Sequence, residues 1–241
     1  MLAAMPGRAT AILVWVWAIF AAGAFQPETG MLRRLYEEAL SRRQAEFGSA
    51  DARTAQAARD LGLFLVNAGD KAGARRAMGD ALRIDEKSLG ASAPQTLEDA
   101  ATLASVSPRA EAEPLLRRAA ESPDASVAGP ALTSLADFRK AVGDRAGAAG
   151  LLHRAVAKAE VLNGKDSPTV ALILNMEALV VDAKDAVPLM SRALAIDKSA
   201  LGPAHSRTQR DVRQLAILLR QTGRANEAAQ LEQQYKVGAA R

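Results

Sequence analysis

A spaced pattern of small and apolar residues recurs along almost the whole chain and constrains its fold more than any other feature. Each copy has an alanine, an apolar residue four positions later and another alanine three positions after that. Full copies are Ala74, Met78, Ala81; Ala112, Leu116, Ala119; Ala148, Leu152, Ala155; and Ala186, Met190, Ala193, with weaker copies at Leu32, Tyr36, Ala39 and Ala228, Glu232, Tyr235. The last positions of successive copies lie 42, 38, 36, 38 and 42 residues apart. This period predicts one supersecondary unit stacked on copies of itself.

Two helices fit inside each period. In one unit we expect a first helix over 52–68, a turn at Gly69-Asp70 and a second helix over 72–89 that carries the repeated pattern on its buried face. Further turns inside pairs are expected at Ser107-Pro108, Gly143-Asp144 and Gly223-Arg224, and breaks between pairs at Phe47-Gly48, Leu89-Gly90, Asn163-Gly164 and Leu201-Gly202.

Small or hydroxyl residues follow these breaks and are expected to open the next helix. They are Thr54, Thr96, Thr169 and Thr208. In the middle unit Ser122-Pro123-Asp124 is expected to open the helix instead. In the last copy of the pattern Glu232 replaces the apolar residue, and we expect it to lie on a solvated end cap.

The residues Leu61-Gly62, Leu65, Ala74, Met78 and Ala81 resemble the tetratricopeptide pattern of two paired helices. The long second helices end in Leu-Gly, as at Leu89-Gly90, which is similar to the 42-residue tetratricopeptide variant of kinesin light chains and their bacterial relatives. The resemblance implies an all-α, right-handed α-α superhelix, a solenoid of about five helix pairs over roughly 31–237. Units at 97–105 and 170–180 are about one turn short.

The first 24 residues differ from the rest. Arg8 is their only charged residue, Ala11 to Ala22 form an apolar run of 12 residues, and Ala22-Gly23-Ala24 offers a small-x-small cleavage site. These are the parts of a secretory signal peptide, and a bilayer span needs roughly 20 apolar residues. We expect a signal peptide over 1–24, a short linker over 25–30 and a disordered tail over 238–241. After cleavage near Ala24 the protein is expected to be exported, either periplasmic or secreted. The alternative is that the segment stays uncleaved and anchors the protein in the membrane.

The composition gives little support to catalysis or nucleic-acid binding. The chain has no cysteine, two histidines, 24% charged residues of both signs and a net charge of +4. It contains no motif of a hydrolase, zinc protease or calcium loop, and no basic patch interleaved with aromatic residues. We therefore predict no enzyme activity, no metal and no cofactor. His205 is expected in a loop between units as a structural residue, and His153 near the start of a second helix.

The resemblance implies that the first helix of each pair lines a concave groove that binds a protein or peptide. Arg210, Arg213 and Arg220 share one side of a predicted helix, and such a row favours an acidic partner. A solvated basic helix is the alternative for this row. The candidate binding residues are Arg59, Asn67, Thr102, Asp137, Lys140, Asn175, Arg210, Arg213, Arg220 and Gln221, with Glu98 and Thr133 in the same register.

We accordingly predict a non-catalytic interaction scaffold. The alternative is a structural or assembly subunit of a cell-envelope complex that uses its convex face or its ends. Membrane contact is expected only if the N-terminal segment stays uncleaved, and nucleic acid is not expected as a partner.

Overall fold

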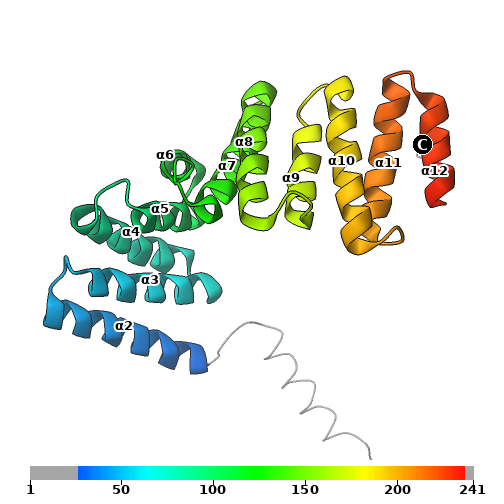
Figure 1. Ribbon diagram of the computed structural model, residues 1–241. Helices are drawn as coiled ribbons and strands as arrows, with labels where there is room; N and C mark the ends of the chain where they lie inside the picture. The colour runs from blue at the N-terminus through cyan, green and yellow to red at the C-terminus, as the bar shows by residue number, and fades with distance from the viewer. Residues whose placement is uncertain (1–26, 237–241) are drawn as a thin grey trace, which may run out of the picture. The chain divides into compact units, whose positions relative to one another are not determined.

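The computed structural model describes residues 27–236, and in this range the chain forms α-helices and no strands (Figure 1). The all-α prediction is therefore confirmed. The expected signal peptide and C-terminal tail lie outside the described residues. The helices are α2 (Pro27–Phe47), α3 (Ala52–Asn67), α4 (Lys71–Ser88), α5 (Pro94–Val106), α6 (Arg109–Ala119), α7 (Ala125–Ala141), α8 (Arg145–Asn163), α9 (Pro168–Ala178), α10 (Ala183–Leu201), α11 (Ser206–Gln221) and α12 (Ala225–Tyr235).

The contacts within the chain define two compact units, Met1–Ala81 and Leu82–Arg241. In the first unit, the rings of Tyr36 on α2 and Phe64 on α3 stack with their centroids 5.1 Å apart. Met78 on α4 packs directly on Gly62 of α3, where an added Cβ would lie 2.8 Å from the methionine side chain. Gly62 therefore allows the two helices of this pair to approach closely.

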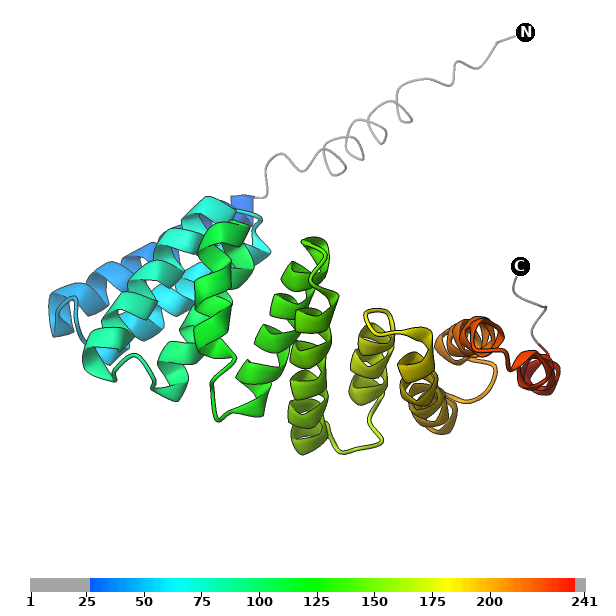
Figure 2. The same ribbon diagram turned by 90° about the horizontal axis from the view of Figure 1, so that it is seen from above.

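In the second unit each helix packs against the next one along the chain (Figures 1 and 2). The repeated pattern forms the contact surface of the second helices, as expected. The residues of its three full copies are no more than 6% exposed; they are Ala112, Leu116, Ala119, Ala148, Leu152, Ala155, Ala186, Met190 and Ala193. Because the alanine side chain occupies little volume, the helix axes can lie close together. The predicted tetratricopeptide-like solenoid of paired helices is confirmed.

The turns and breaks lie where the glycines predicted them. Seven glycines at these positions have φ between 79° and 91°, a region in which other residues are strained. The hydroxyls of Thr54 and Thr208 donate to the carbonyl oxygens of Gly48 and Gly202, at 2.8 and 2.9 Å. In the pair of α9 and α10, Val170 occupies the position equivalent to Thr54 and Thr208, and Ser167 caps α9. Thr169, the expected residue, is exposed.

Two expectations were wrong in detail. The described part of the expected linker is helical, because α2 already begins at Pro27. Glu232 is not on a solvated cap: it is 6% exposed and accepts two hydrogen bonds from the Arg220 guanidinium, at 3.0 and 2.6 Å. A buried carboxylate at this position is possible only because an arginine on the preceding helix neutralises it.

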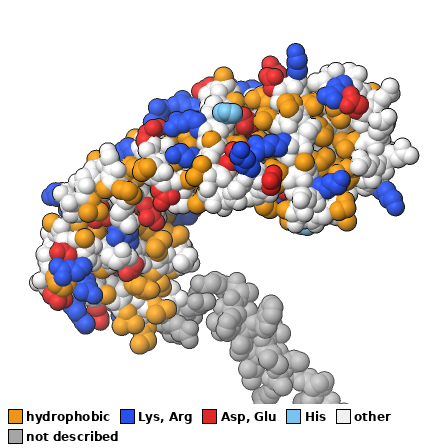
Figure 3. All heavy atoms as spheres, viewed as in Figure 1, with side chains coloured by type: hydrophobic (Ala, Val, Ile, Leu, Met, Phe, Trp, Pro, Cys, Tyr) orange, Lys and Arg blue, Asp and Glu red, His pale blue; other side chains and the backbone are white. Residues whose placement is uncertain are grey.

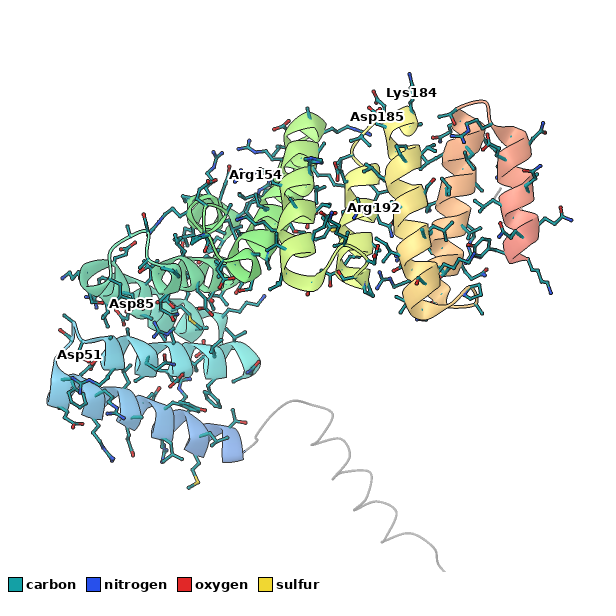
Figure 4. All side chains as sticks on the ribbon, viewed as in Figure 1. Asp51, Asp85, Arg154, Lys184, Asp185 and Arg192 are labelled. Atoms are coloured by element: carbon teal, nitrogen blue, oxygen red, sulfur yellow. The ribbon has the colours of Figure 1, made fainter. Side chains whose placement is uncertain are left out.

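A ladder of arginines connects consecutive second helices. Arg118, Arg154 and Arg192 each precede the last alanine of a pattern copy, and they contact Glu86, Glu121 and Glu160 at 2.7, 3.0 and 2.6 Å. Figure 4 shows Arg154 and Arg192 on α8 and α10. Each arginine also donates to a backbone carbonyl in the preceding segment. Arg118 is therefore engaged between repeats.

Candidate functional site

A hollow surface of the second unit lies between the first helices of two consecutive pairs, α5 and α7. Two adjoining hollows of about 410 and 340 Å³ share the lining residues Ala101, Ser105 and Pro130. We call this surface the α5–α7 groove. The larger hollow is completed by Leu116 of α6 and Phe138 of α7. Its volume falls in the range of small-ligand and side-chain sites.

A missing leucine explains why the larger hollow exists. The residue eleven positions after Thr54 is Leu65, and the residue eleven positions after Thr208 is Leu219. Both leucines are buried in their own units. The equivalent residue after Thr96 is Ser107, which lines the hollow and donates its hydroxyl to the Leu103 carbonyl oxygen at 2.8 Å. Serine fills less space than leucine, and α5 ends before this residue.

Opposite charges lie at the two ends of the groove. Glu98, on the smaller hollow, is exposed and accepts from the Gln95 side-chain amide at 3.3 Å. Arg109, on the larger hollow, places its guanidinium carbon 4.7 Å from the centroid of the Phe138 ring and donates to the Phe138 carbonyl oxygen. These contacts hold the Arg109 guanidinium at the rim.

The charge around Arg109 is unbalanced in favour of the cation. Glu113 pairs with Arg117 at 2.8 Å and with Arg139 at 3.1 Å. A hydrogen bond from Arg117 and the nearby Arg139 and Arg109 charges lower the pKa of Glu113. Arg109, Arg117 and Arg139 all lie near Glu113. Within residues 27–236, however, no carboxylate lies within 4 Å of the Arg109 guanidinium.

The structure places the predicted binding residues in several different settings. Thr102 lines the groove and donates to the Glu98 carbonyl oxygen at 2.9 Å. Asp137 and Lys140 are exposed on α7. Arg59 and Asn67 belong to α3 of the first unit, where Asn67 is exposed and Arg59 bonds to Gln56.

The three arginines of α11 lie in different settings. Arg213 and Arg210 are exposed, and Gln221 is exposed at the end of the helix. Arg220 is instead held by Glu232 of α12, which raises the Arg220 pKa through a hydrogen bond. Replacing Arg220 by glutamate would set two carboxylates against each other, so this arginine is a structural residue.

Asn175 is also buried, and its amide donates to Asp211 at 3.0 Å. Asp211 of α11 and Asp197 of α10 are 1% and 0% exposed. Arg207 donates to Asp197 at 2.8 Å, and Arg210 lies 3.8 Å from Asp211. Burial, followed by a hydrogen bond with the Asp197 carboxyl, raises the pKa of Asp211 to about 6.

The two histidines lie outside the groove. His205 caps α11 by accepting from the Arg207 backbone N–H at 3.2 Å, so its expected structural role is confirmed. The His153 ring is largely exposed, with Nδ1 3.4 Å from Oε1 of Glu177. Glu177 is buried, and this burial raises its pKa.

No cluster of three or more metal-binding side chains occurs within residues 27–236. In the same range, no helix combines the length and apolar character that a membrane span requires. On the face that Figure 3 presents, basic and acidic side chains are interspersed with hydrophobic ones.

Paired antiparallel helices in tandem define a helical repeat protein, and tetratricopeptide repeats are one class of this architecture. Residues 54–94 match the family model described as "Tetratricopeptide repeat", so this segment is a tetratricopeptide repeat. No curated protein matches over its sequence.

Solved structures with the same fold cover most of the chain. BtubC (BKLC) from P. vanneervenii has a TM-score of 0.66 at 19% identity, over 88% of this chain and 90% of that one. A putative kinesin light chain with TPR-like repeats from Podosopora anserina has a TM-score of 0.57 at 21% identity, over 75% and 92%. The MamA protein has 0.54 at 17% identity, over 77% and 91%. The resemblance to kinesin-light-chain-like repeats is confirmed at the level of fold.

Sequence reasoning missed Ser107, Arg109 and Phe138 as groove residues. Ser107 could have been found from the sequence, because two other repeats have leucine at the equivalent position. Arg109 and Phe138 gave no comparable signal, since their contact joins residues 29 positions apart on different helices.

Proposed function

We propose that this protein is a non-catalytic scaffold that binds an extended peptide segment of another protein in the α5–α7 groove. One observation carries the proposal: the two helices form adjoining hollows with an apolar floor, bordered by hydroxyl groups and charges. Apolar surface supplies binding free energy, and the polar border orients the bound chain. The tetratricopeptide repeat, typical of proteins that bind proteins or peptides, supports this function.

The proposal also includes a preference for an acidic partner, with fewer arginines than the sequence predicted. It is supported by the exposed Arg210 and Arg213 on α11 and by Arg109 beside the larger hollow. Arg220 makes no contribution, because Glu232 occupies its guanidinium.

We place this activity in the cell envelope. The support is the sequence of residues 1–24, with Arg8, the apolar run and Ala22-Gly23-Ala24. A signal peptidase would cut after Ala24 and leave Phe25 as the first residue. Sequencing the N-terminus of the native protein tests this, since a cytoplasmic pool that retains Met1 contradicts it. A cell-envelope protein that retains Met1 would favour the membrane-anchored alternative.

A second candidate function is end-to-end assembly in an envelope complex. It is favoured by α2, the first described helix, on which Met31, Leu32 and Leu35 are 67%, 46% and 50% exposed. The residues equivalent to Leu32 and Leu35 in the next pattern copy, Ala74 and Ala77, are buried.

Selection of peptides from a random displayed library on the full chain tests the groove. Ser105 is exposed on the groove side of α5, so Ser105→Trp should block the groove without disturbing the core. Ala157 is exposed on α8, and Ala157→Trp is the matched control. Selected peptides should bind the wild-type chain and the control equally and bind Ser105→Trp at least tenfold more weakly. Recovery of no peptides, or equal binding to both variants, would overturn the proposal.

A further inference from the structure

The groove has a direction, because its two ends differ in shape and in charge. Glu98 marks the end with the smaller hollow, and Arg109 marks the end with the larger, apolar hollow. From Glu98 to the end of α5 at Val106 is about 12 Å at 1.5 Å of rise per residue. An extended peptide covers that distance with about four residues.

We propose that the groove selects an extended peptide of the order basic, small, aliphatic, acidic, or the same order read from the other chain end. The aliphatic side chain enters the larger hollow, the acidic side chain meets Arg109, and the basic side chain meets Glu98. This proposal rests on the proposed peptide-binding function and adds the chemical class of the partner.

The aliphatic position follows from the missing leucine. Leu116, Phe138, Pro130 and alanines line the larger hollow, and Ser107 stands where leucine stands in two other units. The residue that would fill the hollow from within the chain is therefore absent. A leucine side chain supplied by a partner would restore the contacts, and it would remove this apolar lining from water.

The acidic position follows from the charge balance. Arg117 and Arg139 already satisfy Glu113, and Arg109 has no carboxylate at ion-pair distance within residues 27–236. Its guanidinium is fixed on the Phe138 ring and needs little further ordering to accept a carboxylate. Guanidinium groups match carboxylates through paired hydrogen bonds.

The basic position follows from Glu98. This carboxylate is exposed on the border of the smaller hollow, and its side chain accepts from the neutral amide of Gln95. Among the residues that the structure describes, no cation pairs with it, so a cation supplied by the partner would be its first opposite charge there. Because both ion pairs are exposed, their contribution to affinity should fall as salt rises.

The test is an NMR titration of the full chain with the peptide Lys-Ala-Leu-Glu, acetylated and amidated at its ends. Three comparison peptides replace leucine by glycine, glutamate by glutamine, or lysine by glutamate. Each should bind the wild-type chain at least fivefold more weakly. Shifts should concentrate on Ser105, Ser107 and Phe138, and low salt should strengthen binding of the parent peptide.

Three variants separate the components of recognition. Ser107→Leu should fill the hollow and weaken the parent peptide at least tenfold while the melting temperature stays equal or rises. Glu98→Lys, at an exposed position, should reverse the preference, so that Glu-Ala-Leu-Glu binds more tightly than Lys-Ala-Leu-Glu. Arg109→Gln should remove the difference between the glutamate and glutamine peptides.

The inference is overturned if the glycine peptide binds as well as the parent peptide, or if Glu98→Lys leaves the preference unchanged. It is also overturned if neither the parent peptide nor Glu-Leu-Ala-Lys, the same order read from the other chain end, gives shifts up to millimolar concentration. Library peptides that still depend on Ser105 would then leave the proposed function standing without this selectivity. A library that yields no groove-dependent peptide would remove the function itself.

Discussion

Asp197 and Asp211 place two carboxyl groups together inside the stack of α9, α10 and α11. Each has one buried oxygen, Oδ2, without a hydrogen-bond partner. A single proton shared between the two groups would satisfy both oxygens, and it would remove the repulsion between two buried negative charges. Asn175 from α9 and Arg210 on α11 act on Asp211, and Arg207 acts on Asp197. We therefore expect the stability of the last repeats to depend on pH.

We predict that Asp211→Asn stabilises the protein at pH 7.5 and not at low pH. The pKa of Asp211 is about 6 in the folded chain, above its value in the unfolded chain, so the folded state binds the proton more tightly. The ionised form is therefore a cost above pH 6, and the cost disappears as the pH falls toward 4. Chemical unfolding of both proteins across this range should show a difference of about 1–3 kcal/mol at pH 7.5. A difference that does not change with pH would contradict the shared proton.

Glu177 occupies a position where other units carry leucine. It lies seven residues after Val170, as Leu61 lies after Thr54 and Leu215 after Thr208. Its Oε2 atom is buried without a partner, and burial raises its pKa. A polar atom in this state costs free energy that leucine would not.

We predict that Glu177→Leu raises the free energy of unfolding by about 1–3 kcal/mol at pH 7.5. Glu177→Gln keeps the shape and removes the charge, so its gain should be smaller. The advantage of both variants should shrink as the pH falls, because protonation also neutralises Glu177. Urea unfolding provides the measurement. A loss of stability in Glu177→Leu would mean that the carboxylate contributes to packing through His153.

The sequence predicted residues whose role repeats and missed those whose role depends on a single contact. The alanine columns were found because spacing alone defines them. Arg220 and Glu232 were misplaced because an ion pair between α11 and α12 leaves no periodic signal. Asn175 was assigned to the surface for the same reason, since its burial depends on Asp211 of another helix.

At the scale of helices, the glycine turns and helix order followed from local sequence, as at Gly69, Gly143 and Gly223. The start of α2 did not, because nothing at Pro27 distinguishes a linker from a helix whose first turn contains proline. The α5–α7 groove was likewise only partly predictable. Thr102 was predicted as a binding residue, but the larger hollow exists because the Ser107 side chain is too small to fill it.

The closeness of helices within a pair can be tested on α8. Ala155 is fully buried, and Ala157 on the same helix is exposed. Ala155→Leu should overpack the contact and reduce stability by about 1–3 kcal/mol, whereas Ala157→Leu should change it little. Both substitutions add the same side chain to the same helix, so thermal unfolding compares burial alone. Equal tolerance at the two positions would refute the assignment of the alanine column to the helix contact.

At the scale of the whole molecule, the shown tetratricopeptide-like fold is distinct from the groove function and the export that we propose. The fold is shown by the helices and by the solved structures that share it. The groove belongs to the second unit, and the exposed apolar face of α2 belongs to the first. The two proposed functions, peptide binding and end-to-end assembly, use different surfaces, so a partner's point of contact distinguishes them.

Site-specific photo-cross-linking in living cells tests whether the groove is the binding surface. A photoreactive phenylalanine would replace Ser126 on the border of the smaller hollow, Leu35 on α2 or Ala157 on α8, all exposed positions. We predict a discrete adduct at Ser126 in the envelope fraction, absent at Ala157 and lost when Ser107→Leu is added. An adduct at Leu35 without one at Ser126, or adducts of equal yield at Ser126 and Ala157, would contradict the assignment of function to the groove.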